Sequence, residues 1–384
     1  MHPMVIVGSG MAGYTLAREL RKRDAAVPLL VLTADNGDVY SKPMLSTALA
    51  QGQTPERLVQ MTAAQLQAQL GISVRTMTRV ESIDATAHTL YAGGELIAWS
   101  RLVLALGANP VDPHLAGDAA DTVFSVNNLA DYARFRAALP SGGRVVILGG
   151  GLIGCEFAND LAAAGHAVEL VHPREWLLER LLPEQAGRAV QAALGGLGVQ
   201  SHLGRKATAV QRADHGVTVV LDDGRRLQAD IVLSAIGLRP ATALAQQAGL
   251  AVLRGIVVDR WLRSSAADIY AIGDCAEVDG YVLPYVQPLL AQARALAAIL
   301  CGGDAPLAYP VMPVVVKTPA CPVVSLAAAD GRALDWQVEQ AEDGLRARQI
   351  DATGQMAGFV LTGAATRERQ QFAAQLRPLL APAS

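Results

Sequence analysis

The stretch MVIVGSGMAGYTLAREL, residues Met4–Leu20, decides the fold. Its first four residues are all apolar and predict a buried strand. Its second half repeats small and apolar residues at the four-residue spacing of one helix face: Ala12, Leu16 and Leu20. Between them lies a glycine-rich turn, GSGMAG. A strand, this turn and an amphipathic helix predict the first unit of a dinucleotide-binding fold with a parallel sheet.

Each glycine of this turn has its own task. Gly8 allows the tight turn after the strand, Gly10 lets the backbone approach a pyrophosphate, and Gly13 lets the helix pack closely on the strand. The free N–H groups and the dipole at the helix N-terminus favour phosphate binding. Because they lie within the same turn, Ser9 and Ala12 are also expected at the cofactor.

A carboxylate that binds the ribose is expected roughly 20 residues after such a turn. Asp35 follows Gly13 by 22 residues and lies just past the second predicted strand, Leu29–Thr33. Ala34 occupies the place where the acid would most naturally lie. Asp35 is therefore our candidate for the ribose ligand, and a solvated turn residue is the alternative.

The same unit recurs in the middle of the chain. Arg144–Leu148 predicts a strand, the turn GGGLIG follows it, and Ala167–Val171 predicts the next strand. The helix between them again repeats apolar residues on one face: Ile153, Phe157 and Leu161. The glycines of the second turn are Gly149, Gly151 and Gly154. This duplication predicts a second dinucleotide site, for a nicotinamide cofactor.

The sequence does not decide between NADH and NADPH at the second site. An acid at the end of the strand would accept the 2′-hydroxyl of NADH and repel the 2′-phosphate of NADPH. The strand is followed by His172 instead. His172 and Arg174 could contact a phosphate, so both cofactors remain open.

The end of the chain has a different pattern. After Pro310, five short segments predict antiparallel strands: Val314–Val316, Val323–Leu326, Trp336–Glu339, Leu345–Ile350 and Met356–Leu361. Thr366–Leu380 predicts a closing helix. Two segments predict crossings between domains: Asn109–Pro113, and Ile231–Ile236 followed by Gly237 and Pro240.

With 384 residues, the chain is too long for one ordinary core. We predict an α/β fold with two Rossmann-like dinucleotide-binding domains and a small C-terminal α+β domain. The first domain is discontinuous, over residues 1–110 and 236–312. The second covers residues 111–235, and the C-terminal domain covers residues 313–384.

The composition argues against several kinds of partner. The net charge of −3 speaks against nucleic acid, and no apolar run is long enough to predict a membrane helix. The N-terminus enters a strand pattern by Met4 without the features of a signal peptide, so we expect a cytoplasmic protein. The cysteines have no C-x-x-C spacing and predict neither a disulfide framework nor a metal site. The oligomeric state is left open.

Two further segments resemble those of a known family. Ala105 and Gly107 lie in the stretch LALGA, which looks like the A-T-G turn of the family with Leu106 in place of threonine. Ile269–Asp274, IYAIGD, looks like its second FAD fingerprint. Together with both glycine-rich turns, they resemble the FAD/NAD-linked reductases of the glutathione-reductase-like superfamily. This resemblance implies FAD in the first turn, NADH or NADPH in the second, and a hydrogen bond from the ribitol chain to Asp274.

Within this superfamily, the chain resembles the rubredoxin reductases of alkane-oxidising bacteria. Four segments carry the resemblance: YSKPMLS (Tyr40–Ser46), GLIGCEFANDL (Gly151–Leu161), IYAIGDCAEVDG (Ile269–Gly280) and VKTPACP (Val316–Pro322). It implies electron flow from NAD(P)H through FAD to rubredoxin, an acidic iron–sulfur carrier, which would feed an alkane hydroxylase. The alternatives are a ferredoxin reductase of an oxygenase system and a non-catalytic flavoprotein that senses redox state.

The resemblance also implies the catalytic residues. Lys42 and Glu156 would form an ion pair beside flavin N5, within about 4 Å. The alternatives are that Lys42 is a surface lysine and that Glu156 faces solvent. Lys317, or the helix that begins near Val286, would stabilise charge on the reduced flavin. No cysteine precedes Cys155, so electrons are expected to leave the flavin directly for the acceptor.

The expected cofactor-binding residues are Gly8, Ser9, Gly10, Ala12, Gly13, Asp35, Lys42, Pro43, Ala105, Gly107, Gly149, Gly151, Ile153, Gly154, Glu156, Gly237, Gly273, Asp274, Val286 and Lys317. No metal ligand is expected. An acidic partner would need a locally basic docking face, for which the candidates are Lys42, Lys317, Arg294 and Arg18.

Overall fold

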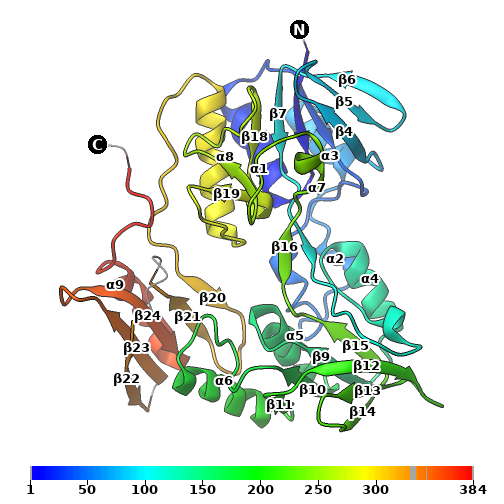
Figure 1. Cartoon of the computed structure of the whole chain (residues 1–384), viewed down its shortest axis with the longest axis vertical. Helices are drawn as coiled ribbons and strands as arrows, with labels where there is room; N and C mark the ends of the chain where they lie inside the picture. Colours follow the sequence, from blue (N-terminus) through cyan, green and yellow to red (C-terminus); the bar gives the residue numbers. More distant parts are fainter. Residues whose placement is uncertain (1, 329–333, 343, 383–384) are drawn as a thin grey trace.

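The computed structural model describes residues 2–328, 334–342 and 344–382 (Figure 1). Its first sheet is parallel throughout, in the order β18-β7-β1-β2-β3. The strands are β1 (Met4–Val7), β2 (Leu29–Leu32), β3 (Ser73–Arg75), β7 (Arg101–Leu104) and β18 (Ile269–Ala271). All residues of β1 and β2 are buried, as expected for a parallel sheet covered on both faces.

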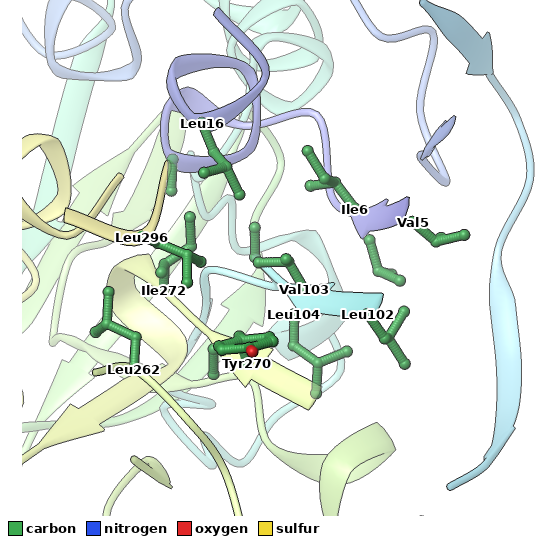
Figure 2. Packing of buried hydrophobic residues seen from close by; sticks show 14 of the residues in the cluster. Val5, Ile6, Leu16, Leu102, Val103, Leu104, Leu262, Tyr270, Ile272 and Leu296 are labelled. Carbon is green, nitrogen blue, oxygen red and sulfur yellow. The ribbon is translucent and has the colours of Figure 1, made fainter. Parts of the chain in front are cut away.

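Helices α1 (Met11–Arg23) and α8 (Val286–Leu300) pack against this sheet and against each other. Figure 2 shows Leu16 of α1 and Leu296 of α8 around the side chain of Val103, all fully buried. The remaining elements of this unit are α2 (Pro55–Leu58), α3 (Ala63–Leu70), β4 (Val80–Asp84), β5 (Thr89–Ala92), β6 (Glu95–Ala98), α7 (Ala243–Gln247), β17 (Ile256–Val258) and β19 (Ala276–Val278).

The second sheet repeats this plan, in the parallel order β11-β10-β9-β15. Its strands are β9 (Arg144–Leu148), β10 (Ala167–His172), β11 (Gln200–Leu203) and β15 (Ile231–Ser234). The helices are α4 (Leu129–Ala138), α5 (Leu152–Ala163) and α6 (Glu184–Gly196), and an antiparallel meander adds β12 (Ala207–Arg212), β13 (Val217–Leu221) and β14 (Arg226–Ala229). The predicted duplication of a strand, a glycine-rich turn and a helix is therefore confirmed.

Two short strands connect the parallel sheets. β8 (Ala108–Pro110) and β16 (Leu238–Pro240) pair antiparallel, and Figure 1 shows β16 running between the two sheets. The predicted crossing at Asn109–Pro113 overlaps β8. The second prediction is wrong for Ile231–Ser234, which forms β15 of the second sheet, and the crossing follows only at β16. Because the chain crosses twice through one hydrogen-bonded ribbon, the two parallel-sheet units are held by more than a single linker.

The third sheet is antiparallel, in the order β20-β21-β24-β23-β22. Its strands confirm all five predicted segments: β20 (Val314–Val316), β21 (Val323–Leu326), β22 (Trp336–Ala341), β23 (Gly344–Ile350) and β24 (Met356–Thr362). Val316, Val323 and Leu345 share one buried cluster with Phe157 of α5. The third sheet is thus packed onto the second nucleotide-binding unit.

The predicted closing helix over Thr366–Leu380 is wrong in extent. A 3₁₀ turn over Gly363–Glu368 leads into α9, which covers only Arg369–Ala373. Pro378 disfavours a helical conformation for the residue before it. The chain then returns to the first unit, where Tyr309 and Leu380 exchange backbone hydrogen bonds of 2.9 and 3.3 Å. No helix among the described residues is long and apolar enough to cross a bilayer.

Candidate functional site

The first glycine-rich turn has the shape that a pyrophosphate requires. A Cβ on Gly8 would lie 2.2 Å from the carbonyl oxygen of Ala105, and one on Gly13 would lie 2.0 Å from that of Gly8. A Cβ on Gly10 would meet no atom within 4 Å. Gly10 is also the N-cap of α1 and makes no side-chain cap. Close packing therefore requires glycine at positions 8 and 13. Gly10 instead leaves open space in front of the free N–H groups of the helix.

The second turn repeats this geometry. A Cβ on Gly149 would lie 2.5 Å from the oxygen of Ala235, and one on Gly154 only 1.8 Å from that of Gly149. At Gly151 the space within 4 Å is again empty, and α5 starts there without a side-chain cap. Both turns fit a dinucleotide.

Asp35 is tied to the first turn. One of its oxygens, Oδ1, accepts hydrogen bonds from Ser9 Oγ at 3.1 Å, from Thr33 Oγ1 at 2.6 Å and from the backbone of Gly37 at 2.9 Å. The structure therefore brings the predicted ribose ligand beside Ser9 of the turn. Its role towards ribose stays a prediction.

The turn at Gly273 and Asp274 lies against the first one. Gly273 has a φ of +79°, a Cβ there would approach Ala12 Cβ at 2.9 Å, and its N–H donates to Gln292 Oε1 at 2.5 Å. Burial raises the pKa of Asp274, and the nearby Lys42 opposes this. We find no hydrogen-bond partner for the Asp274 carboxylate among the described residues. It is free to accept a ligand hydroxyl, as the ribitol prediction requires.

The predicted Lys42–Glu156 ion pair is wrong. Lys42 Nζ donates to Asn127 Oδ1 at 2.7 Å, and Glu156 pairs instead with Lys317 Nζ at 3.2 Å. Glu156 is 1% exposed and also accepts from Ser46 Oγ at 2.5 Å and from the backbone N–H of Lys317 at 2.9 Å. The reason is that Val316 of β20 packs in the same buried cluster as Phe157 of α5, which brings Lys317 to the carboxylate.

Lys42 is only partly buried, and its Nζ is held in the hydrogen bond to Asn127 rather than lying free at the surface. Burial lowers the pKa of Lys42, whereas Asp274 and Asp131 raise it. Its partner Asn127 also donates to the carbonyl of Ala108 at 2.9 Å, at the start of the crossing ribbon. Sequence reasoning missed Asn127, for which no motif gives a signal. It also missed Ser46, although this residue ends the quoted YSKPMLS segment.

One face of α5 binds two distant segments of the chain through buried side chains. Glu156 binds Lys317, Asn159 Oδ1 accepts the N–H of Ala320 at 3.0 Å, and Asp160 accepts those of Leu49 and Ala50 at 2.9 and 3.0 Å. These residues are spaced i, i+3 and i+4, which places them on one helix face. The helix that starts at the second turn therefore holds both the segment after Lys42 and the third sheet.

The other predicted residues lie near these elements. Gly107 and Gly237 adopt φ values of +70° and +129° immediately before the two crossing strands. The carbonyl of Pro43 accepts from Lys317 Nζ. Ile153 is 37% exposed near the start of α5, and Val286 is the first residue of α8. Their contacts with a cofactor stay predictions.

Comparison with known proteins assigns the family. Residues 2–296 match the family model described as pyridine nucleotide-disulphide oxidoreductase. The chain belongs to this family. The predicted fold class and the predicted chemistry, an oxidoreductase that uses FAD and a pyridine nucleotide, are confirmed. Residues 306–376 of this oxidoreductase match a second model, described as the rubredoxin binding C-terminal domain.

Similar proteins agree with this assignment. The rubredoxin-NAD(+) reductase of Alcanivorax borkumensis is 50% identical over 99% of this oxidoreductase and 100% of its own length. That of Acinetobacter baylyi is 45% identical over 100% of both. Among solved structures, putidaredoxin reductase in its covalent complex with putidaredoxin is 26% identical, with a TM-score of 0.88 over 98% and 94% of the two chains. The resemblance to rubredoxin reductases is confirmed.

The family description mentions a disulphide, but none of the four cysteines of this chain forms one. Cys155, Cys275 and Cys321 are buried, Cys301 is exposed, and all four are free. Burial raises the pKa of Cys275 to about 12, so its thiol does not ionise at neutral pH.

Proposed function

We propose that this oxidoreductase passes electrons from NADH through FAD to a rubredoxin. The observation that carries the proposal is the contact between Lys317 and Glu156. Lys317 belongs to the region that matches the rubredoxin-binding domain, and Glu156 lies one turn into the helix that starts at the second glycine-rich turn. The relatives named as rubredoxin-NAD(+) reductases support this acceptor and this donor.

FAD, when bound, supplies the chemistry, because it can take two electrons from a nicotinamide and release them singly. The residues of the chain bind and orient. The two turns direct helix N–H groups at the phosphates, and Asp274 offers an acceptor to a hydroxyl. Lys42 keeps a partly buried cation near Asp274, and Lys317 balances the buried carboxylate of Glu156. Charges held this way need little reorganisation when electrons arrive.

A reoxidation experiment tests this proposal. FAD-loaded protein is reduced with NADH without oxygen, and flavin absorbance is followed after mixing with a rubredoxin or a ferredoxin. We expect NADH to bleach the flavin and rubredoxin to reoxidise it faster than ferredoxin or oxygen. Faster reoxidation by ferredoxin would assign the ferredoxin-reductase alternative, which the likeness to putidaredoxin reductase favours. A flavin that NADH does not bleach would indicate the non-catalytic sensor.

We also propose that the reduced rubredoxin feeds an alkane hydroxylase. The sequence resemblance to reductases of alkane-oxidising bacteria supports this step. Relatives from Escherichia coli, 38% identical, are named nitric oxide reductase FlRd-NAD(+) reductases and provide the competing destination. Deleting the gene should abolish growth on alkanes and leave growth on the corresponding alcohols unchanged. We further propose that the domains meet near residues 110, 235 and 312. Limited proteolysis should cleave the chain near these limits.

A further inference from the structure

The proposed reaction gives no role to His172, a buried histidine at the end of β10, or to its partly buried partner Glu179. His172 occupies the position where dinucleotide folds place the ribose-binding acid. Its side chain does not point to solvent, because the N–H of Gly150 donates to Nδ1 at 3.0 Å and Nε2 lies 2.9 Å from Glu179 Oε2. Since Nδ1 is an acceptor here, the ring proton lies on Nε2 and is donated to Glu179. The imidazole therefore bridges the second glycine-rich turn and a carboxylate.

Glu179 is held against this turn by its own segment as well. The N–H of Leu178 donates to the carbonyl of Gly150 at 2.9 Å, so the loop after β10 folds back onto the turn. The side chain of Glu179 is 19% exposed, which leaves its carboxylate accessible to a ligand. Burial lowers the pKa of His172, more than Glu179 raises it. A neutral imidazole does not cancel the charge of the carboxylate, so the pair carries a negative charge beside Gly150.

Two arginines of this region already lie near carboxylates. Arg205 lies 2.7 Å from Asp223, and Arg180 is 90% exposed and 3.9 Å from the other oxygen of Glu179. Arg174 is exposed in the same loop and is the residue that could receive a 2′-phosphate. Glu179 is therefore fixed in the site by hydrogen bonding, whereas the side chain of Arg174 makes no hydrogen bond among the described residues.

We propose that the His172–Glu179 pair replaces the single acid of other dinucleotide sites and sets the preference for NADH over NADPH. Glu179 accepts the 2′-hydroxyl of the adenosine ribose and repels a 2′-phosphate, and His172 is the positioning residue that fixes it to the turn. This inference rests on the proposed use of a nicotinamide dinucleotide and names the residue that selects it. Each tenfold change in the ratio of the two dissociation constants corresponds to about 1.4 kcal/mol of binding free energy.

Binding of two ligands to the oxidised, FAD-loaded protein tests the proposal without any acceptor. ADP-ribose and its 2′-phosphorylated form are titrated by calorimetry, and the ratio of their dissociation constants gives the preference. Glu179→Gln keeps an oxygen that accepts from His172 Nε2 and removes the charge. We expect this change to reduce the preference for ADP-ribose about tenfold or more, chiefly through tighter binding of the phosphorylated ligand.

Glu184→Gln is the matched control, because Glu184 is half exposed at the start of α6 and pairs only with Arg188 among the described residues. It should leave the ratio unchanged. An unchanged ratio in Glu179→Gln, or equal shifts in both variants, overturns the proposal. A shift in Arg174→Gln alone would assign the preference to Arg174 and also overturn it. The binding experiment contains no rubredoxin, so its result does not depend on whether rubredoxin is the acceptor. The reoxidation experiment, in turn, does not depend on which residue selects NADH.

Discussion

Gly151 and Gly154 belong to one turn, yet a side chain would meet different surroundings at each. Gly154→Ala should lower the free energy of unfolding by about 2–4 kcal/mol, because its Cβ would overlap the carbonyl oxygen of Gly149. Gly151→Ala should leave thermal stability nearly unchanged, since its φ of −78° suits alanine and the space is empty. It should still weaken NADH binding, because the methyl group would occupy the approach of the pyrophosphate.

Thermal unfolding and NADH titration of these two variants check the assignment. If Gly154→Ala loses stability and Gly151→Ala loses only NADH binding, packing accounts for glycine at position 154 and the ligand accounts for glycine at position 151. Equal losses of stability in both variants would mean that Gly151 is also a packing residue.

The four cysteines differ in exposure, and this difference is measurable. Cys301, at the end of α8, is exposed, whereas burial raises the pKa values of Cys155, Cys275 and Cys321. We expect one thiol per chain to react quickly with a chromogenic disulfide under native conditions and four after denaturation. Cys301→Ser should remove the fast reaction. A second fast thiol in that variant would show that a buried cysteine becomes accessible.

Elements formed by neighbouring residues could be predicted from the sequence, whereas contacts between distant residues could not. Both turns, their helices and the five strands of the third sheet follow from local spacing. The partner of Glu156 does not, because Lys317 stands 161 residues away and only the packing of β20 on α5 brings it there. The same holds for His172, where sequence showed a missing acid but not that the loop would fold back and bring Glu179 to it.

At the scale of elements, α8 connects the turn at Gly273 and Asp274 to the end of the chain. Its Gln292 is 2% exposed, accepts from the N–H of Gly273 and donates to Tyr309 Oη at 2.6 Å. Tyr309 in turn pairs with Leu380. The conformation of the turn that carries Asp274 therefore depends on a glutamine nineteen residues later.

Gln292→Leu should weaken FAD binding by roughly 5- to 100-fold, because it leaves a buried N–H of Gly273 without its acceptor. The measurement is a titration of apoprotein with FAD, followed by the quenching of flavin fluorescence. Gln287→Leu is the control, since Gln287 is exposed on the same helix. If both variants bind FAD alike, Gln292 has no part in holding the turn.

At the scale of the molecule, the buried polar face of α5 joins the second unit to the segment after Lys42 and to the segment after β20. Glu156 and Asp160 bond to segments that precede and follow the second unit, and a common apolar cluster extends over the same elements. We therefore expect one cooperative unfolding transition, with coincident midpoints for tryptophan fluorescence and far-ultraviolet circular dichroism. Asp160→Ala should lower both midpoints together. Separate midpoints in the unchanged protein would contradict this coupling.

The return of Leu380 to Tyr309 has a consequence for exchanging parts between relatives. The segment that contains the whole antiparallel sheet starts and stops at two points joined by a 2.9 Å hydrogen bond. A segment with such neighbouring ends can be exchanged as one cassette. A chimera built at these junctions would transplant the acceptor-binding sheet of another reductase. It would retain a native contact at α5 wherever the donor cassette carries a lysine at the position of Lys317.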